Sequence, residues 1–368
     1  MREEIFDKPK PEPAFYGLNH LRDFFVVVNA AALIRTKHEG ILGVLVVAPQ
    51  GSGKSEMMMA AAQRFKWRVI TEATKGGINR VLVEIANFKG ITADGVPMIA
   101  IPELHTMISG TRRARDLPGF LNAMLAEGFV EKKTEVPDKY DIKSTGGPAK
   151  ASVVMACVPN AFHDREFKKA IRNTGLSSRL LYYYFTYSPT DRKRILKRIA
   201  AMAGDAGSVE TEPIFGEYTL HKKAFISEEV KARVNAMAMR LAKFKSCLYG
   251  DPVEPLPTRE NYQILSILRG LSALHGRIDL DNINKLIAFF PFFRPNKPGT
   301  ELHYRIILEL SSPMNNLELN KKIISYGYTH AEYAEAIRDL MDEYRLIRPY
   351  IVGGQTMLTL TDFSEEVI

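Results

Sequence analysis

The stretch with the clearest chemical character is residues 48–55, which read APQGSGKS. It follows the apolar run 41–47 and precedes the segment 56–62, EMMMAAA, so the order is strand, glycine loop, helix. Glycines let backbone N–H groups turn toward phosphates, and the start of the helix adds partial positive charge. We therefore predict a nucleotide site made of Gln50, Gly51, Ser52, Gly53, Lys54, Ser55 and Glu56.

Two side chains of this loop suit a nucleotide directly. Lys54 is long enough to reach the terminal phosphates of ATP, and the Ser55 hydroxyl is a suitable ligand for the accompanying Mg²⁺. Ala48 stands where the pattern usually opens with glycine, and alanine fits unless that position needs a positive φ. The alternative is a glycine loop that joins a strand to a helix without a ligand. The lysine and serine in register, with both flanks correct, favour the phosphate loop.

Hydrolysis of a bound nucleotide needs a carboxylate that orients or deprotonates the attacking water. Glu103 follows the apolar strand predicted at 98–101, which places it at the edge of a sheet beside the loop. Pro102 precedes it, at the position where an Asp would support the Mg²⁺ shell. Tight coordination of the metal is therefore not expected. The alternative is a strand that simply ends at these two residues.

Two further polar residues flank predicted strands. Asn160 follows the strand predicted at 151–158, where an amide would contact the γ-phosphate, although asparagine after proline is equally ordinary in a turn. Arg179 precedes the strand predicted at 180–187, and an arginine there would reach a neighbouring subunit's γ-phosphate. A plain surface arginine is the alternative. With Glu103, these residues form the predicted catalytic set.

The elements that must position these residues alternate between strand and helix over residues 15–190. Further predicted elements are an amphipathic helix through Leu21, Phe24, Phe25, Val28 and Ala32, a short strand at 67–70, and helices at 117–127 and 164–172. This alternation is typical of a three-layer α/β domain around a mainly parallel sheet. Residues 1–14 are polar and proline-bearing, and we expect a flexible arm there.

Two more units are predicted after this domain. Residues 191–299 show helical patterns at 191–203, 227–247, 258–275 and 281–289 without clear strands, which indicates a helical domain. Residues 300–368 predict helices at 303–310, 317–325 and 329–344, then strands at 346–352 and 355–360 around Gly353 and Gly354. Thr329 and Glu332 have the spacing of a capping box. Three helices followed by a hairpin are the order of a winged helix.

Composition limits the partners and the compartment. The 368 residues include 50 Lys and Arg against 42 Asp and Glu, and the net charge of +8 favours a polyanionic partner. Two cysteines cannot form a disulfide framework, so we expect a reducing, cytoplasmic compartment. The longest apolar stretch, 24–34, is too short to span a bilayer, and no membrane partner is expected.

Together these stretches resemble the AAA+ ATPases, and within them the group with a hairpin before the first sensor, which includes the minichromosome-maintenance helicases. The resemblance covers about residues 41–187 and rests on Lys54 with Ser55 and on the segments 101–107, 122–124, 130–150, 156–160 and 178–180. Val158 stands where the family's sensor Asn would lie, with Asn160 displaced by two positions. A divergent member from a virus or mobile element is our interpretation.

The resemblance implies an ATP-driven ring, most simply a hexamer, that acts on DNA with ATP and Mg²⁺ as cofactors. Contacts of one head-to-tail kind also build filaments, and the sequence leaves that alternative open. One hypothesis is a helicase-like motor in DNA replication. The other is an ATP switch, a loader or regulator that assembles on DNA in replication or transposition and recruits a partner protein. Pro102 favours the switch, whereas the pore-type hairpin favours the motor.

The resemblance also implies a lid over 258–275 that carries a second sensor arginine. Arg259 and Arg269 both fit that role loosely.

Basic clusters are the first candidates for DNA contact, because counterion release drives such binding. Arg112 and Arg113 form the tightest cluster, and Lys132 and Lys133 lie in the predicted hairpin, which lines the ring's pore in the resembling family. A solvated loop is the alternative for the hairpin, since acids dilute its charge. The last predicted helix carries Glu332, Glu335, Asp339, Asp342 and Glu343 against Arg338 and Arg345. We expect that helix to contact protein rather than DNA.

Overall fold

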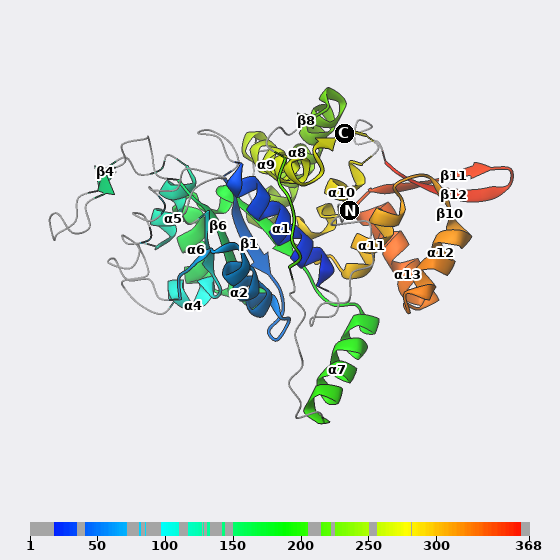
Figure 1. Ribbon diagram of the computed structural model, residues 1–368, viewed down its shortest axis with the longest axis horizontal. Helices are drawn as coiled ribbons and strands as arrows, with labels where there is room; N and C mark the ends of the chain where they lie inside the picture. The colour runs from blue at the N-terminus through cyan, green and yellow to red at the C-terminus, as the bar shows by residue number, and fades with distance from the viewer. Residues whose placement is uncertain are drawn as a thin grey trace.

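The computed structural model places helices on both faces of a central sheet, with the C-terminal helices and hairpin at one end (Figure 1). It describes residues 18–34, 41–71, 81, 85, 97–109, 117–126, 128, 131–132, 142–143, 150–204, 215–221, 225–249, 256–280 and 282–361. The predicted arm at 1–14 lies outside these residues.

The central sheet has five parallel strands. They are β1 Gly43–Val47, β2 Arg68–Val69, β3 Met98–Ile101, β6 Ser152–Cys157 and β7 Leu180–Tyr184, in the order β2-β3-β6-β1-β7. β1, β3 and β6 are buried throughout, as apolar runs in a parallel sheet covered on both faces are. The predicted α/β class with a parallel sheet is thus confirmed. Because all strands run the same way, their carboxyl ends meet at one edge.

Two buried clusters cover the two faces of the sheet. Val44 and Val46 of β1 join the larger cluster, which includes α1 Asn19–Leu33 and α2 Lys54–Phe65. Leu45 and Val47 point the other way, into the cluster that includes α4 Leu104–Ser109, α5 Leu117–Leu125 and α6 Arg165–Asn173. This alternation follows from the two-residue period of a strand. Packing in these two clusters holds β1 and α2, the elements on either side of the glycine loop.

Helix α1 differs from the amphipathic helix that the sequence predicts. It is buried on every side from His20 to Ala32, since α9 Thr258–His275 and α11 Glu301–Glu309 cover the side opposite the sheet. A Cβ on Gly270 of α9 would overlap the Val27 carbonyl oxygen, so α1 and α9 approach backbone to backbone. The helix is therefore a central element of the fold.

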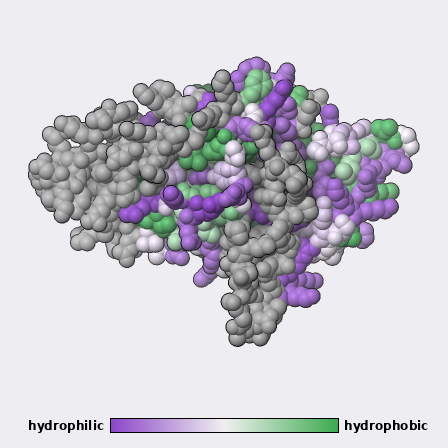
Figure 2. Space-filling model, viewed as in Figure 1, coloured by the Kyte–Doolittle hydropathy of each residue, from purple (hydrophilic) through white to green (hydrophobic). Residues whose placement is uncertain are grey.

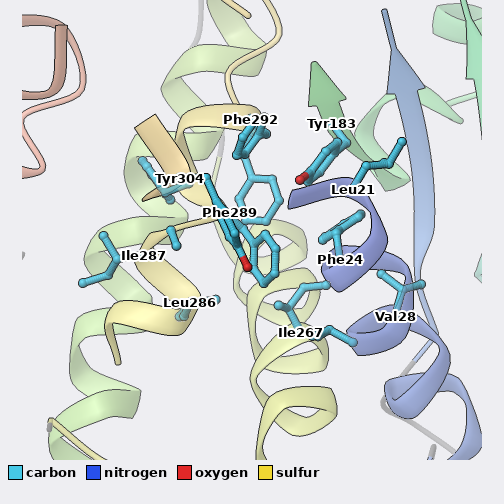
Figure 3. Packing of buried hydrophobic residues seen from close by; sticks show 14 of the residues in the cluster. Leu21, Phe24, Val28, Tyr183, Ile267, Leu286, Ile287, Phe289, Phe292 and Tyr304 are labelled. Atoms are coloured by element: carbon cyan, nitrogen blue, oxygen red, sulfur yellow. The ribbon is translucent and has the colours of Figure 1, made fainter. Parts of the chain in front are cut away.

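Aromatic rings join α1, β7 and the region before α11 (Figure 3). Tyr183 of β7 stacks on Phe24 of α1 at 4.1 Å between ring centroids and on Phe292 at 4.9 Å. Phe292 belongs to the short 3-10 helix η4 Phe290–Phe292. The core thus continues from the sheet into residues beyond 284.

The region after β7 is mainly helical. It contains α7 Pro189–Gly204, α8 Glu228–Tyr249, α9 and α10 Asn284–Ile287. In place of the single helix predicted at 281–289, the structure has the short helix α10 followed by the separate 3-10 helix η4. The region also contains a two-residue parallel pair, β8 Phe225–Ile226 with β9 Arg277–Ile278, which the sequence does not predict because two residues carry no periodicity.

The C-terminal unit has three helices and a three-stranded antiparallel sheet. Its elements are α11, β10 Met314–Asn315, α12 Asn316–Ser325, α13 His330–Arg338, the π-helical turn η5 Asp339–Glu343, β11 Ile347–Val352 and β12 Gln355–Leu360. The predicted capping box forms, with the Glu332 N–H donating to Thr329 Oγ1 and the Thr329 N–H donating to Glu332 Oε2. Gly353 and Gly354 have φ of 57° and 78°, as a type I′ turn requires.

The end of this hairpin exposes apolar side chains. Ile351 is 76% exposed and Val352 is 57% exposed. Figure 2 shows hydrophobic surface at this end of the molecule. Hydrogen bonds also cross the expected domain boundaries: the Thr186 N–H donates to Gly299 O across the boundary at 190, and the Thr190 N–H donates to Glu332 Oε1 across those at 190 and 299. The division into domains stays a prediction.

Candidate functional site

The glycine loop connects β1 to α2 at the carboxyl edge of the sheet. Gly51 and Gly53 have φ of 70° and 74°, the left-handed region in which a side chain would be strained. Ala48 has no positive φ, and its N–H donates to Cys157 O at 3.3 Å, so the alanine is accommodated. The Met57 N–H donates to Gly53 O at 2.9 Å, which starts α2 directly at the loop. The glycines thus occupy positions that require them.

Lys54 is the cation of this loop. Its side chain is largely buried, and Nζ donates to Pro49 O at 3.3 Å. Burial lowers the pKa of Lys54, while the Glu56 and Glu103 carboxylates act in the opposite direction. In the described part of the chain, Nζ forms no ion pair within 4 Å. A phosphate in the loop would supply that counter-charge.

Ser52 has a buried hydroxyl without a partner among the described residues. It is 3% exposed, and its Oγ has no hydrogen-bond partner among the described residues. A buried hydroxyl without a partner costs about 1–3 kcal/mol, so a ligand oxygen here would be stabilising. The Ser52 carbonyl is already used, because it accepts a hydrogen bond from the Tyr187 hydroxyl. Ser55, at the first turn of α2, is partly buried.

Glu103 lies at the same edge of the sheet, in the turn between β3 and α4. Its side chain is exposed and accepts a hydrogen bond from Thr106 Oγ1 at 3.2 Å. β6 lies between β3 and β1, so the strand that carries Glu103 lies two strand spacings, in total about 10 Å, from the strand before the loop. Such a gap leaves room for a terminal phosphate and a water molecule. The structure therefore brings the predicted carboxylate to the edge that carries Lys54.

Asn160 lies at this edge too, in the 3-10 helix η2 Pro159–His163 that follows β6, and its side chain is exposed. His105 Nε2 lies 2.9 Å from Asp164 Oδ2, a pair that the sequence does not predict. Asp164 also caps α6, since its Oδ1 accepts from the Glu166 and Phe167 N–H groups. The pair ties α4, which starts beside Glu103, to the start of α6. An Asp just before a predicted helix is a typical N-cap, so the sequence could have indicated the role of Asp164, whereas nothing in the sequence indicates that His105 binds it.

Arg179 lies at the amino ends of the strands, opposite the carboxyl ends that carry the glycine loop. It ends the 3-10 helix η3 Ser177–Arg179, and the next residue, Leu180, pairs with Gly43 at the start of β1. Its Nη1 donates to Asn122 Oδ1 at 2.6 Å and to Gly175 O at 3.2 Å. The arginine is therefore not part of the loop's surroundings within its own chain.

The two candidates for a second sensor both belong to α9. Arg259 donates from Nη1 to Ser178 Oγ, beside Arg179, and Gln263 Nε2 donates to Arg179 O at 2.8 Å. Arg259 is therefore also remote from its own glycine loop. Burial lowers the pKa of Arg269, which is partly buried on the same helix.

The candidates for DNA contact are described only in part. β4 Glu131–Lys132 pairs antiparallel with β5 Ile142–Lys143, the pairing expected of the predicted hairpin at 130–150. β4 lies at the end of the molecule opposite the C-terminal unit (Figure 1). Arg112, Arg113 and Lys133 lie outside the described residues, as does the side chain of Lys132.

The acids of the last helical segment contact their own chain. Glu332 accepts from the Thr190 N–H at 2.8 Å and from Thr190 Oγ1 at 2.6 Å. Asp339 pairs with Lys297 at 2.8 Å, and Glu343 pairs with Arg294 at 3.1 Å. These contacts hold the C-terminal unit against the rest of the protein, which explains three of the five acids.

Comparison with known proteins gives no relative: no family model and no curated protein matches this chain. Across the described ranges, no helix is both long and apolar enough to cross a membrane. Nor do three or more His, Cys, Asp or Glu side chains gather there as a group that could hold a metal ion.

Proposed function

We propose that this chain is an ATP-hydrolysing enzyme of the AAA+ type. The observation that carries the proposal is the loop itself. Gly51 and Gly53 adopt positive φ directly before a helix, Lys54 is buried beside them, and the Ser52 hydroxyl has no partner in the described chain. Glu103 lies at the same sheet edge, where a water-orienting carboxylate is needed.

The residues of the site have separate roles in binding and hydrolysis. Backbone N–H groups of residues 50–54 and the start of α2 bind the phosphates, and Lys54 neutralises their charge. Mg²⁺, when bound, further neutralises the phosphates, and Ser55 is the residue that would hold it. Glu103 orients the attacking water, and Asn160 contacts the γ-phosphate from the end of β6. Water then attacks the γ-phosphorus, and ADP leaves as phosphate forms.

The Glu103→Gln variant tests this assignment. It keeps the size of the side chain but removes the charge, so we expect retained ATP binding and hydrolysis slower by about two to three orders of magnitude or more. Glu166→Gln, an exposed acid at the start of α6, is the matched control and should hydrolyse ATP normally. Wild-type turnover in Glu103→Gln would assign the catalytic carboxylate elsewhere.

The DNA-directed part of the proposal is a ring motor with helicase-like activity in replication. The antiparallel pair β4–β5, the net charge of +8 and a C-terminal unit in winged-helix order support it. The second candidate is an ATP switch that loads or regulates a partner on DNA. Pro102 favours this candidate, because it replaces the Asp expected at the metal site. A strand-displacement assay separates them, because only the motor displaces a strand and only with hydrolysable ATP.

A further inference from the structure

Tyr187 connects the glycine loop to the segment between β7 and α7, which contacts the C-terminal unit through Thr190. It lies three residues beyond the end of β7, and its hydroxyl donates to the carbonyl of Ser52 in the middle of the loop. Its partly buried ring packs edge-to-face on Phe185, with centroids 6.1 Å apart. No motif in the sequence singles this tyrosine out, and the mechanism above gives it no role.

The hydrogen bond fixes the direction of one peptide group. In a trans peptide the carbonyl and the following N–H point in opposite directions, and the described chain has no cis peptide bond. The Ser52 carbonyl points toward Tyr187, so the Gly53 N–H points away from it. No backbone bond in the described chain uses that N–H. It is therefore oriented in advance for an acceptor in the loop.

The segment that carries Tyr187 is held at several points. The Phe185 N–H donates to Val47 O at 3.0 Å, at the end of β1, and the Thr186 N–H donates to Gly299 O at 2.9 Å. On the other side, Thr190 is bound by Glu332 of α13 through two hydrogen bonds. The phenol is thus presented to the loop from a fixed base, and little ordering remains to be done when a ligand binds.

We propose that Tyr187 is a positioning residue, which holds the Ser52–Gly53 peptide so that the Gly53 N–H donates to a nucleotide phosphate. The inference rests on the proposed nucleotide function of the loop and adds a residue to it. Tyr187 acts through the loop backbone and does not itself contact the nucleotide. The same hydrogen bond connects the phosphate site to the docking contacts of the C-terminal unit.

The test is Tyr187→Phe, which keeps the ring and removes only the hydroxyl. We expect the Kd for ATP and for ADP, measured by calorimetric titration, to rise about threefold to tenfold, the effect of one lost hydrogen bond. The KM for ATP should rise in parallel with kcat nearly unchanged, because the N–H binds ground state and transition state alike. Tyr333→Phe is the control. The Tyr333 hydroxyl donates to Asn316 within the C-terminal unit and not to the glycine loop, so its loss should change neither Kd nor KM.

The outcomes separate this inference from the proposed function. If Lys54→Ala loses ATP binding while Tyr187→Phe binds as the wild type does, the nucleotide site stands and the role of Tyr187 is refuted. If the wild-type chain binds neither ATP nor ADP, the proposed function fails as well. Thr190→Val provides a second variant that loosens the base of Tyr187, and a smaller rise in Kd is expected there. Unchanged Kd values in both variants would overturn the proposal.

Discussion

Arg179 is expected to complete the nucleotide site of a neighbouring copy, since it lies at the wrong end of the sheet to serve its own. The residue after it pairs with Gly43, whereas the glycine loop follows Val47. The five residues of β1 at about 3.3 Å each separate the arginine from the loop by roughly 16 Å along the strand. Its Nη1 is also bound to Asn122. An effect of this arginine on hydrolysis therefore requires assembly.

The perturbation is Arg179→Ala, measured as ATPase rate and ATP affinity. An arginine supplied by a neighbour contributes about 10³–10⁵ to kcat, so we expect a loss on that scale with affinity nearly unchanged. Arg165→Ala, an exposed arginine at the start of α6, serves as the control and should keep its activity.

Mixing two inactive variants makes the test specific. Lys54→Ala keeps its arginine and Arg179→Ala keeps its loop, so some interfaces in mixed assemblies join an intact loop to an intact arginine. With random exchange at equal amounts, about one quarter of the head-to-tail interfaces are of this kind, and roughly that share of wild-type activity should return. No activity at any ratio, with mixed assemblies shown to form, would refute the shared site.

Three further predictions test the fold and the DNA contact. Gly270→Ala should lower the free energy of unfolding by about 1–3 kcal/mol, because its Cβ would overlap the Val27 carbonyl, whereas Gly119→Ala, in open space within α5, should raise it by up to about 1 kcal/mol; urea titration measures both. Burial lowers the pKa of His275 from 6.5 to about 4, so the unfolded chain takes up the proton first. Stability should fall by up to about 1.4 kcal/mol per unit as the pH drops through that window, and His275→Gln should remove this dependence in pH-resolved denaturation. Replacing Lys132 and Lys133 together should weaken DNA binding at all sequences and flatten its salt dependence more than Arg348→Ala in the C-terminal hairpin does; the reverse order in a salt titration would place the main DNA contact in that hairpin.

Local signals in the sequence predicted much of the fold. The apolar run before residue 48 predicts β1, and the glycines that follow are the ones that need positive φ. The capping box at Thr329 and the Gly353-Gly354 turn also depend on residues at most three positions apart. Such features are fixed by chemistry within one turn or one strand, so a single sequence is enough to find them.

Contacts between distant segments could not be predicted in this way. The outer side of α1 is covered by α9, which lies far along the chain, so periodicity within α1 indicated only one buried face. The hydrogen bond from Tyr187 to Ser52 and the pair of His105 with Asp164 join residues 135 and 59 positions apart. Neither pair has a local signature. The sequence therefore indicated candidate residues for the chemistry, but not which other residues hold those candidates in place.

Calorimetric titration of ATP with Mg²⁺ into the wild-type chain and into Lys54→Ala tests the nucleotide site most directly. The wild type should bind, and Lys54→Ala should not, because the loop loses its one lysine and the charge that faces the phosphates. Lys168→Ala, which removes an exposed lysine from α6, should bind as the wild type does. Equal ATP binding by the wild type and Lys54→Ala, or none by the wild type, would contradict the assignment of residues 48–55 as a phosphate-binding loop.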